Sequence, residues 1–314
     1  MKAENLTSVT EFILMGLSSH HKTQILLFVI IFLVYLLTVL GNLTVILLVQ
    51  ADTHLQTPMY YFLTHLSGLE ICYITTTLPQ VLTHLMAGNG AISFLRCAIQ
   101  MHMLSSLGGT ECFLLGVMAY DRYLAICHPL LYTIAMGRWR QLQLALASWV
   151  SGFLCSTINA SCTFSYPYCG PNHINHFVCE LPVVLKLACA DTSVTEIVIS
   201  GTSALIVLGS LSVILTSYGL ILSSVLKMQS VAGMRKAFST CASHLAVVTL
   251  FYGTVITMYL RPGLGSGSDF DKKIAVFYIM VTPLLNPIIY CLRNKDIHAA
   301  VAKVLQRLVF LQKR

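Results

Sequence analysis

The chain has 314 residues, of which 56% are hydrophobic and only 10% are charged, and its mean hydropathy is +0.77. Soluble domains carry about 25% charged residues, so this composition excludes an ordinary soluble protein and indicates a membrane protein. The net charge of +7 requires no nucleic-acid partner, because the cytoplasmic loops of membrane proteins are normally rich in Lys and Arg.

The apolar stretches, taken in chain order, predict seven membrane-spanning helices. A helix needs about 20 predominantly apolar residues to cross a bilayer, and charge-poor windows of this length lie at residues 25–49, 58–86, 97–127, 142–164, 195–226, 237–260 and 274–292. The second window is the least clear, because it carries His65, Glu70, Pro79 and His84; a re-entrant or partly wet helix is the alternative there. We therefore expect an all-α membrane protein, with an extracellular N-terminus at 1–24, a seven-transmembrane helix bundle at 25–292 and a cytoplasmic tail at 293–314.

The tail carries an amphipathic pattern. Its apolar residues recur at helical spacing, with Lys303 and Arg307 between them: Ile297, Val301, Val304, Leu305 and Leu308. This pattern predicts a short amphipathic helix on the inner leaflet. A solvated basic tail is the alternative.

The positive charges favour an extracellular N-terminus and a cytoplasmic C-terminus, because cytoplasmic segments collect Lys and Arg. In that orientation twelve of the 19 Lys and Arg residues are cytoplasmic: Arg122, Arg138, Arg140, Lys227, Arg235, Lys236, Arg293, Lys295, Lys303, Arg307, Lys313 and Arg314. Asn5, in the glycosylation sequence Asn5-Leu6-Thr7, would then face the lumen.

Four of the eleven cysteines would meet an oxidising compartment in this topology. They are Cys97, Cys169, Cys179 and Cys189, and four cysteines allow three disulfide pairings. A zinc site formed by Cys169, His173, His176 and Cys179 is the alternative.

Two carboxylates are predicted at similar depth inside the membrane. At 1.5 Å per residue, Glu70 lies roughly 18 Å along its helix from Pro58, and Glu111 lies roughly 16 Å from Arg122. If they face each other, they must share a proton, bind a cation such as sodium, or bond to polar neighbours such as Asn42 and Asn286. Two separate protonated carboxyl groups are the alternative.

The stretch MAYDRYLAIC at 118–127 places Asp121 and Arg122 at the inner end of the third predicted helix. We expect an ion pair between them that can break, which would make it a latch. A simple interfacial anchor, with the arginine reaching toward water, is the alternative.

Five stretches in order resemble the olfactory receptors, of the tetrapod class II type, within the rhodopsin-like G-protein-coupled receptors. They cover almost the whole chain: GN at 41–42, PMYYFLTHLS at 58–67, MAYDRYLAICHPLLYT at 118–133, KAFSTCASHL at 236–245 and PLLNPIIYCLRN at 283–294. The resemblance implies a receptor in the plasma membrane that is not an enzyme and has no cofactor other than a sodium ion.

The resemblance also implies residue roles. Arg122, flanked by Asp121 and Tyr123, would meet a G protein once the sixth helix moves, and Arg235 and Lys236 would contact the same protein. The switch residues would be Tyr218, Asn286, Pro287 and Tyr290. Glu70 and Glu111 would form the cation pocket, although most of the family has aspartate in place of Glu70. The disulfides would be Cys97–Cys179 and Cys169–Cys189.

An odorant cavity is expected in the outer half of the bundle. Its predicted lining is Leu104, Ser105, Gly108, Gly109 and Cys112 on the third helix, with Tyr252, Val255 and Tyr259 on the sixth. The two glycines either make room for a ligand or let a neighbouring helix approach. The outer layer of the helices shows no acidic residue, which disfavours a protonated amine.

The expected partners are a small volatile odorant, the lipid bilayer and a stimulatory G protein of the olfactory type that raises cyclic AMP. A transporter and an intramembrane enzyme are the alternatives, but the chain shows neither repeated halves nor a nucleophile paired with a base.

Overall fold

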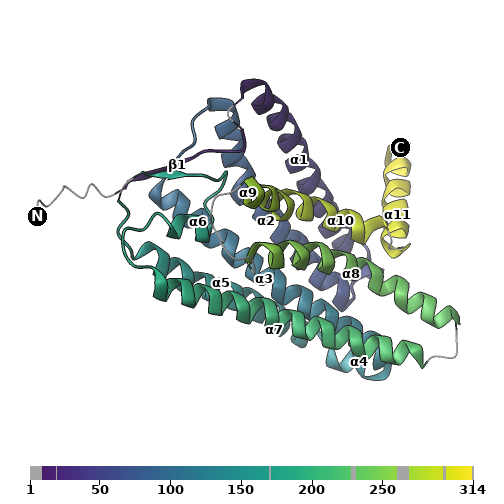
Figure 1. The fold of residues 1–314 in the computed structure, drawn as a ribbon. Helices are drawn as coiled ribbons and strands as arrows, with labels where there is room; N and C mark the ends of the chain where they lie inside the picture. Colours follow the sequence, from purple (N-terminus) through teal and green to yellow (C-terminus); the bar gives the residue numbers. More distant parts are fainter. Residues whose placement is uncertain are drawn as a thin grey trace, which may run out of the picture.

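Long helices lie side by side and form a bundle (Figure 1). The computed structural model describes residues 9–18, 20–169, 171–227, 231–259, 269–292 and 295–312. The bundle helices are α1 (His21–Ala51), α2 (Pro58–Ala87), α3 (Phe94–Cys127), α5 (Arg138–Phe164), α7 (Ser193–Leu226) and α8 (Val231–Tyr259), and the last segment is composed of α9 (Asp269–Val276), η2 (Phe277–Val281) and α10 (Thr282–Leu292). The predicted seven-helix bundle is confirmed; the sequon at Asn5 lies outside the described residues.

Among the described residues, six helices are long and apolar enough to cross a membrane, and α2 is not one of them. The 30 residues of α2 extend for about 45 Å, which exceeds a hydrocarbon core of about 30 Å. Its polar residues Ser67, Glu70 and Thr77 are buried, because α2 packs against α1, α3 and α10. A helix that faces protein on several sides needs less apolar surface, which explains its weak sequence signal.

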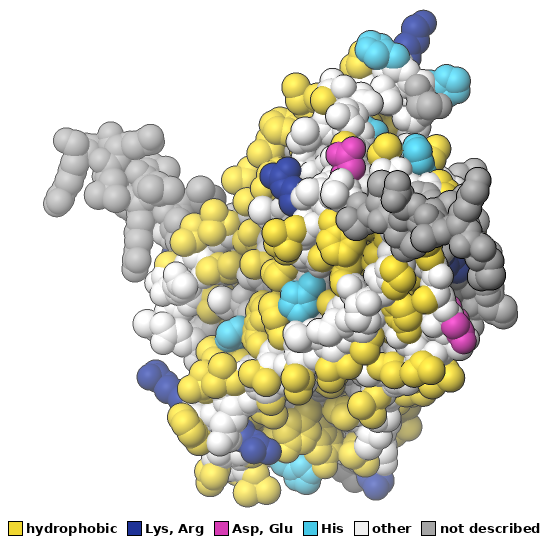
Figure 2. Space-filling model, turned by 90° about the vertical axis from the view of Figure 1, so that its left-hand side faces the viewer, with side chains coloured by type: hydrophobic (Ala, Val, Ile, Leu, Met, Phe, Trp, Pro, Cys, Tyr) yellow, Lys and Arg dark blue, Asp and Glu magenta, His cyan; other side chains and the backbone are white. Residues whose placement is uncertain are grey.

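The centre of the bundle is α3. In the most apolar 18-residue window of α3, 67% of the residues are buried, against 11% in the corresponding window of α1. The reason is that α3 contacts α2, α5, α7 and α8. In contrast, α1 exposes large apolar side chains such as Leu26, Leu33 and Leu37. Figure 2 likewise shows a surface rich in hydrophobic side chains with few charges. A soluble protein would bury such a surface, whereas lipid accommodates it.

A small sheet and two disulfides lie at one end of the bundle, which we call the disulfide end (Figure 1). The strands are β1 (Glu11–Leu14), β2 (Ala91–Ser93) and β3 (His173–Ile174), in the order β2-β1-β3. Phe12 pairs with Ile92 in the antiparallel register, and Leu14 pairs with Ile174 in the parallel one. The sequence did not predict this sheet, which joins the N-terminal segment to two loops. A short helix, α6 (Leu181–Leu185), lies in the longer of these loops.

The opposite end of the bundle, which we call the Arg122 end, carries three short elements: η1 (Thr53–Leu55), α4 (Pro129–Ala135) and α11 (Lys295–Gln312). The predicted tail helix is confirmed as α11, which runs across the direction of the bundle helices (Figure 1). Its Ile297 and Ala300 are buried, and Lys303 Nζ forms an ion pair of 3.0 Å with Asp52 Oδ2.

Candidate functional site

A cavity of about 100 Å³ lies in the disulfide half of the bundle. Side chains from α3, α5, α7, α8 and the last segment form its walls, and residues of the long loop before α7 cover it. The lining is largely apolar, with Leu104, Ile206, Val207 and Phe251 among its members. Such a cavity suits a small, mostly apolar molecule.

Six of the eight residues predicted to contact the ligand line this cavity: Leu104, Ser105, Gly108, Gly109, Cys112 and Val255. The side chain of Tyr259 lies outside the described residues. Tyr252 is not part of the lining, and the α8 residues that face the cavity are Phe251, Val255 and Met258. Adjacent helical residues point about 100° apart, so Tyr252 faces the neighbouring helices instead.

Tyr252 joins three helices just behind the cavity wall. Its hydroxyl donates to Ser210 Oγ of α7 at 2.7 Å and lies 3.4 Å from the backbone oxygen of Cys112 on α3. Because Cys112 and Phe251 line the cavity and both contact Tyr252, a ligand would act on Tyr252 through such neighbours.

The two predicted glycines have different surroundings. A Cβ on Gly108 would meet no atom within 4 Å, so this glycine leaves space in the cavity. A Cβ on Gly109 would lie 3.4 Å from Gly152 Cα, so this glycine also allows α5 to approach α3. Gly108 therefore fits the interpretation that a glycine makes room for a ligand, and Gly109 fits the interpretation that a glycine lets a neighbouring helix approach.

Besides the predicted Ser105, the cavity has polar lining residues that we did not predict: Ser156 and Asn159 on α5, Ser203 on α7, and Tyr278 of η2. Ser156 Oγ donates to the backbone oxygen of His102 at 2.8 Å. Ser148, Ser156 and Asn159 are buried at helical spacing on α5. This stripe of polar residues in an apolar stretch is the sequence pattern that could have predicted the polar lining.

Glu180 corrects the expectation that no acidic residue lies near the ligand. It comes from the loop rather than a helix, lines the cavity and is buried. Both of its carboxylate oxygens lack a hydrogen-bond partner in the part of the chain that the structure describes. Burial, with a smaller contribution from Asp271, raises the pKa of Glu180 to about 8, so the group is mainly neutral at pH 7.

His176 lies beside Glu180, with 3.9 Å between His176 Nε2 and Glu180 Oε2. Burial lowers the pKa of His176 to about 4. Since both groups are mainly neutral at pH 7, this contact is not an ion pair at that pH. That a protonated amine is disfavoured stays a prediction, because a cation beside Glu180 would favour the ionised form of this carboxyl.

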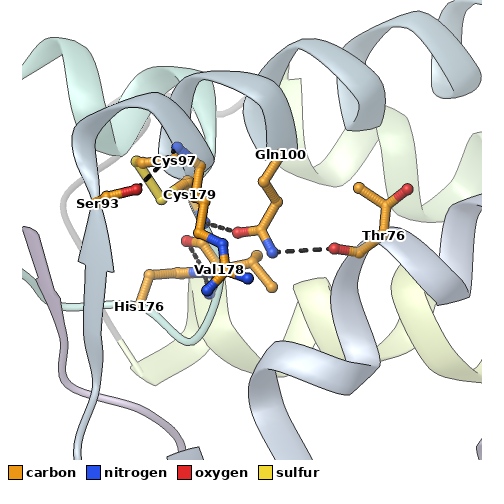
Figure 3. Close-up of a disulfide and its surroundings, with 8 residues drawn as sticks. Thr76, Ser93, Cys97, Gln100, His176, Val178 and Cys179 are labelled. Atoms are coloured by element: carbon orange, nitrogen blue, oxygen red, sulfur yellow. Dashed lines mark hydrogen bonds between the residues drawn. A yellow bond between two sulfur atoms is a disulfide. The ribbon is translucent and has the colours of Figure 1, made fainter. Parts of the chain in front are cut away.

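Figure 3 shows how the loop is fixed over the bundle. The disulfides are Cys97–Cys179 and Cys169–Cys189, the pairing that the resemblance implies. Gln100 Oε1 accepts from the backbone nitrogen of Cys179 at 2.8 Å, and its Nε2 donates to the Thr76 oxygen at 3.1 Å. The zinc alternative is not formed, because Cys169 and Cys179 are bonded in different disulfides.

Glu70, Glu111 and Asn286 meet in the middle of the bundle. Asn286 Nδ2 donates to Glu70 Oε1, and Glu111 interacts electrostatically with both residues. Three buried oxygens here have no hydrogen-bond partner among the described residues: Glu70 Oε2, Glu111 Oε1 and Asn286 Oδ1. Asn42, the other suggested neighbour, instead donates to the backbone oxygen of Pro283 at 3.3 Å.

No cluster of three or more His, Cys, Asp or Glu side chains suited to a metal occurs in the described part of the chain. The carboxyl and amide oxygens around Glu70 nevertheless suit a hard cation, which prefers oxygen ligands.

Asp121 and Arg122 interact electrostatically, but the hydrogen bond of Asp121 goes to another residue, and the breakable ion pair stays a prediction. The buried Asp121 Oδ1 accepts a hydrogen bond of 2.8 Å from the Tyr132 hydroxyl of α4. Arg122 also lies within electrostatic range of Tyr218, His244 and Tyr290. Tyr132 and His244 are therefore two partners that sequence reasoning missed.

A hydrogen bond and an apolar cluster join α3, α7 and α8 at the Arg122 end. The Tyr218 hydroxyl of α7 shares a hydrogen bond of 2.7 Å with His244 Nδ1 of α8. Around it, Ile221, Val225 and Cys241 form a buried apolar cluster against which Tyr123 packs. We call these six residues, together with Arg122, the switch cluster.

The last segment supplies the remaining predicted switch residues. The Tyr290 hydroxyl is buried and lacks a hydrogen-bond partner among the described residues. Pro287 lies inside α10, and a π-helical turn, η2, precedes α10. Single π-helical turns are frequent at functional sites, and Tyr278 of this turn lines the cavity.

Comparison with known proteins agrees with this arrangement. The profile of the olfactory receptor family matches residues 31–308. Olfactory receptor 9I1 of Homo sapiens is 49% identical over 98% of this chain and 98% of its own length, and olfactory receptor 2G3 of Homo sapiens is 47% identical over 96% and 97%. Olfactory receptor 5AP2 of Mus musculus is 46% identical over 98% and 96%. The chain belongs to the olfactory receptor family.

Proposed function

We propose that this multi-pass plasma-membrane protein is an odorant receptor that binds a small volatile molecule in the cavity and activates a stimulatory G protein of the olfactory type. The response would be a rise in cyclic AMP. Family membership supports odorant sensing, and the small, largely apolar cavity supports a small ligand.

The observation that carries the proposal is the position of α3. This helix lines the cavity with residues up to Cys112 and carries Arg122 ten residues further on, which is about 15 Å along a helix. One helix therefore connects the ligand cavity with the switch cluster.

Activation would be a shift between two arrangements that both exist without ligand. A ligand moves such an equilibrium only by its difference in affinity for the two states. The arrangement described above is the closed one, with Tyr218 bonded to His244. Outward movement of α8 would break this bond and expose Arg122 to a G protein.

The proposed orientation places the disulfide end outside the cell. Disulfides persist in oxidising compartments, and the two pairs lie at that end. At the Arg122 end, Arg138, Arg140, Lys227 and Arg235 are exposed, as the positive charge of cytoplasmic loops requires.

The test is cyclic AMP output in cells that express the chain with the olfactory-type G protein, screened against an odorant panel. We expect a ligand-dependent rise that Arg122→Ala abolishes at equal surface expression. Arg140→Ala is the control, because it removes an exposed arginine from the same end. A fully signalling Arg122→Ala variant would contradict the role of Arg122.

The alternatives from other classes do not match the family. Olfactory receptors are signalling proteins and not enzymes, so the intramembrane-enzyme alternative is set aside. A transporter would move labelled substrate without any G protein, and a flux assay on silent but surface-expressed protein would reveal it.

A further inference from the structure

Asn159 is a fixed hydrogen-bond donor in the cavity wall. It is 6% exposed and lines the cavity from α5. Its Oδ1 accepts from Thr202 Oγ1 of α7 at 3.0 Å; the same hydroxyl also lies 3.0 Å from the Ile199 oxygen. Because Oδ1 is engaged with Thr202, the group left to face the cavity is the Nδ2 amide.

The Nδ2 amide donates to no described residue. The two carboxylate oxygens of Glu180 also lack a partner among the described residues, but they have almost no exposed surface. An amide nitrogen can only donate hydrogen bonds, whereas the hydroxyl groups of Ser105 and Ser203 can either donate or accept. Asn159 is therefore a polar group of the lining that can only donate to a ligand.

A ligand that fills the cavity must satisfy this donor or leave it without water and without a partner. Leaving a buried donor unsatisfied is unfavourable, and sites built around such a group reject analogues that lack the matching atom. The remaining wall is largely apolar, so one oxygen on a hydrocarbon frame is the complementary structure.

We propose that the cavity recognises neutral odorants that carry a hydrogen-bond-accepting oxygen, such as ketones, aldehydes and esters, and that the Asn159 Nδ2 amide donates to that oxygen. This inference rests on the proposed function, since it names the ligand class of the same cavity.

The experiment measures direct binding to the purified full-length chain in lipid nanodiscs, without G protein, by ligand-induced thermal stabilisation. Three probes share one ring: cyclooctanone supplies an acceptor, cyclooctane supplies no polar group, and cyclooctylamine supplies a protonated amine. We expect cyclooctanone to bind at least about tenfold more tightly than the other two.

The variant Asn159→Leu keeps a similar volume without the donor, and it should lose the preference for cyclooctanone while it still binds cyclooctane. That retained binding shows that the variant is folded. Thr157→Val is the control on the exposed face of the same helix, and it should behave as the unaltered chain.

Equal binding of cyclooctanone and cyclooctane, preference for cyclooctylamine, or no binding of any probe would overturn the inference. An unchanged preference in Asn159→Leu would do so as well. Selective binding without a cyclic AMP response would leave the inference standing and would count against the proposed function.

Discussion

At the scale of single residues, Gly152 of α5 lies close to the backbone of α3. A Cβ at this position would lie 2.8 Å from the Ser106 oxygen and 2.7 Å from the Thr110 nitrogen, both in the backbone of α3. We expect Gly152→Ala to destabilise the protein by about 1–3 kcal/mol, as overpacking does. Thermal unfolding in nanodiscs would measure this. Gly201→Ala is the control, since its Cβ would meet no atom within 4 Å; equal stability of both variants would contradict the packing argument.

The buried Glu180 predicts a pH dependence of stability. Burial raises its pKa from 4.5 to about 8. Between these values the unfolded chain releases the proton while the folded chain keeps it, so this group lowers the free energy of unfolding as pH rises through that window. Glu180→Gln cannot ionise, and its unfolding temperature relative to the unaltered chain should increase from about pH 4.5 to about pH 8.

The lowered pKa of His176 acts in the opposite direction, but it is present in both proteins and cancels in the difference. Glu196→Gln, at the exposed start of α7, should show no such trend. A pH-independent difference for Glu180→Gln would show that this carboxyl is not buried.

At the scale of secondary-structure elements, the bond between Tyr218 and His244 holds α7 against α8. His244→Phe keeps a ring but removes the Nδ1 partner, and we expect a higher cyclic AMP level without odorant because the closed arrangement becomes less stable. His298→Phe is the control, because His298 is an exposed residue of α11. A basal level equal to or below that of the unaltered receptor would argue against this contact as a restraint.

The sequence predicted the long helices but not the small elements. Strands of four, three and two residues are too short for a periodic pattern, and they pair only because the bundle brings their loops together. The π-helical turn η2 likewise has no pattern in the sequence. By contrast, α11 was predictable, since its apolar face repeats at helical spacing.

At the scale of the whole molecule, α2, α3 and α10 bring Glu70, Glu111 and Asn286 together. Their unpartnered oxygens lead us to expect that sodium chloride stabilises the receptor against heat more than potassium chloride at equal ionic strength. A bound ion would add about 2.7 kcal/mol at 100 times its Kd. Glu70→Gln should abolish the difference, and Glu196→Gln should retain it.

Sodium and potassium having the same effect on the unaltered chain would instead favour two carboxyl groups that share a proton. That outcome would leave the contact between Asn286 and Glu70 as a purely structural one.

The sequence by itself determined the class of the protein, the number of spans and the residues of its motifs, because the bilayer demands long apolar helices and penalises charge within them. Only the tertiary structure decided which side chains meet. Tyr252 lies behind the cavity while Phe251 lines it, Asp121 accepts a hydrogen bond from Tyr132, and Glu180 and Asn159 line the cavity. The physical reason is that a step of one residue turns a side chain by about 100° on a helix, so the partner of each residue is set by how distant helices and loops pack around it.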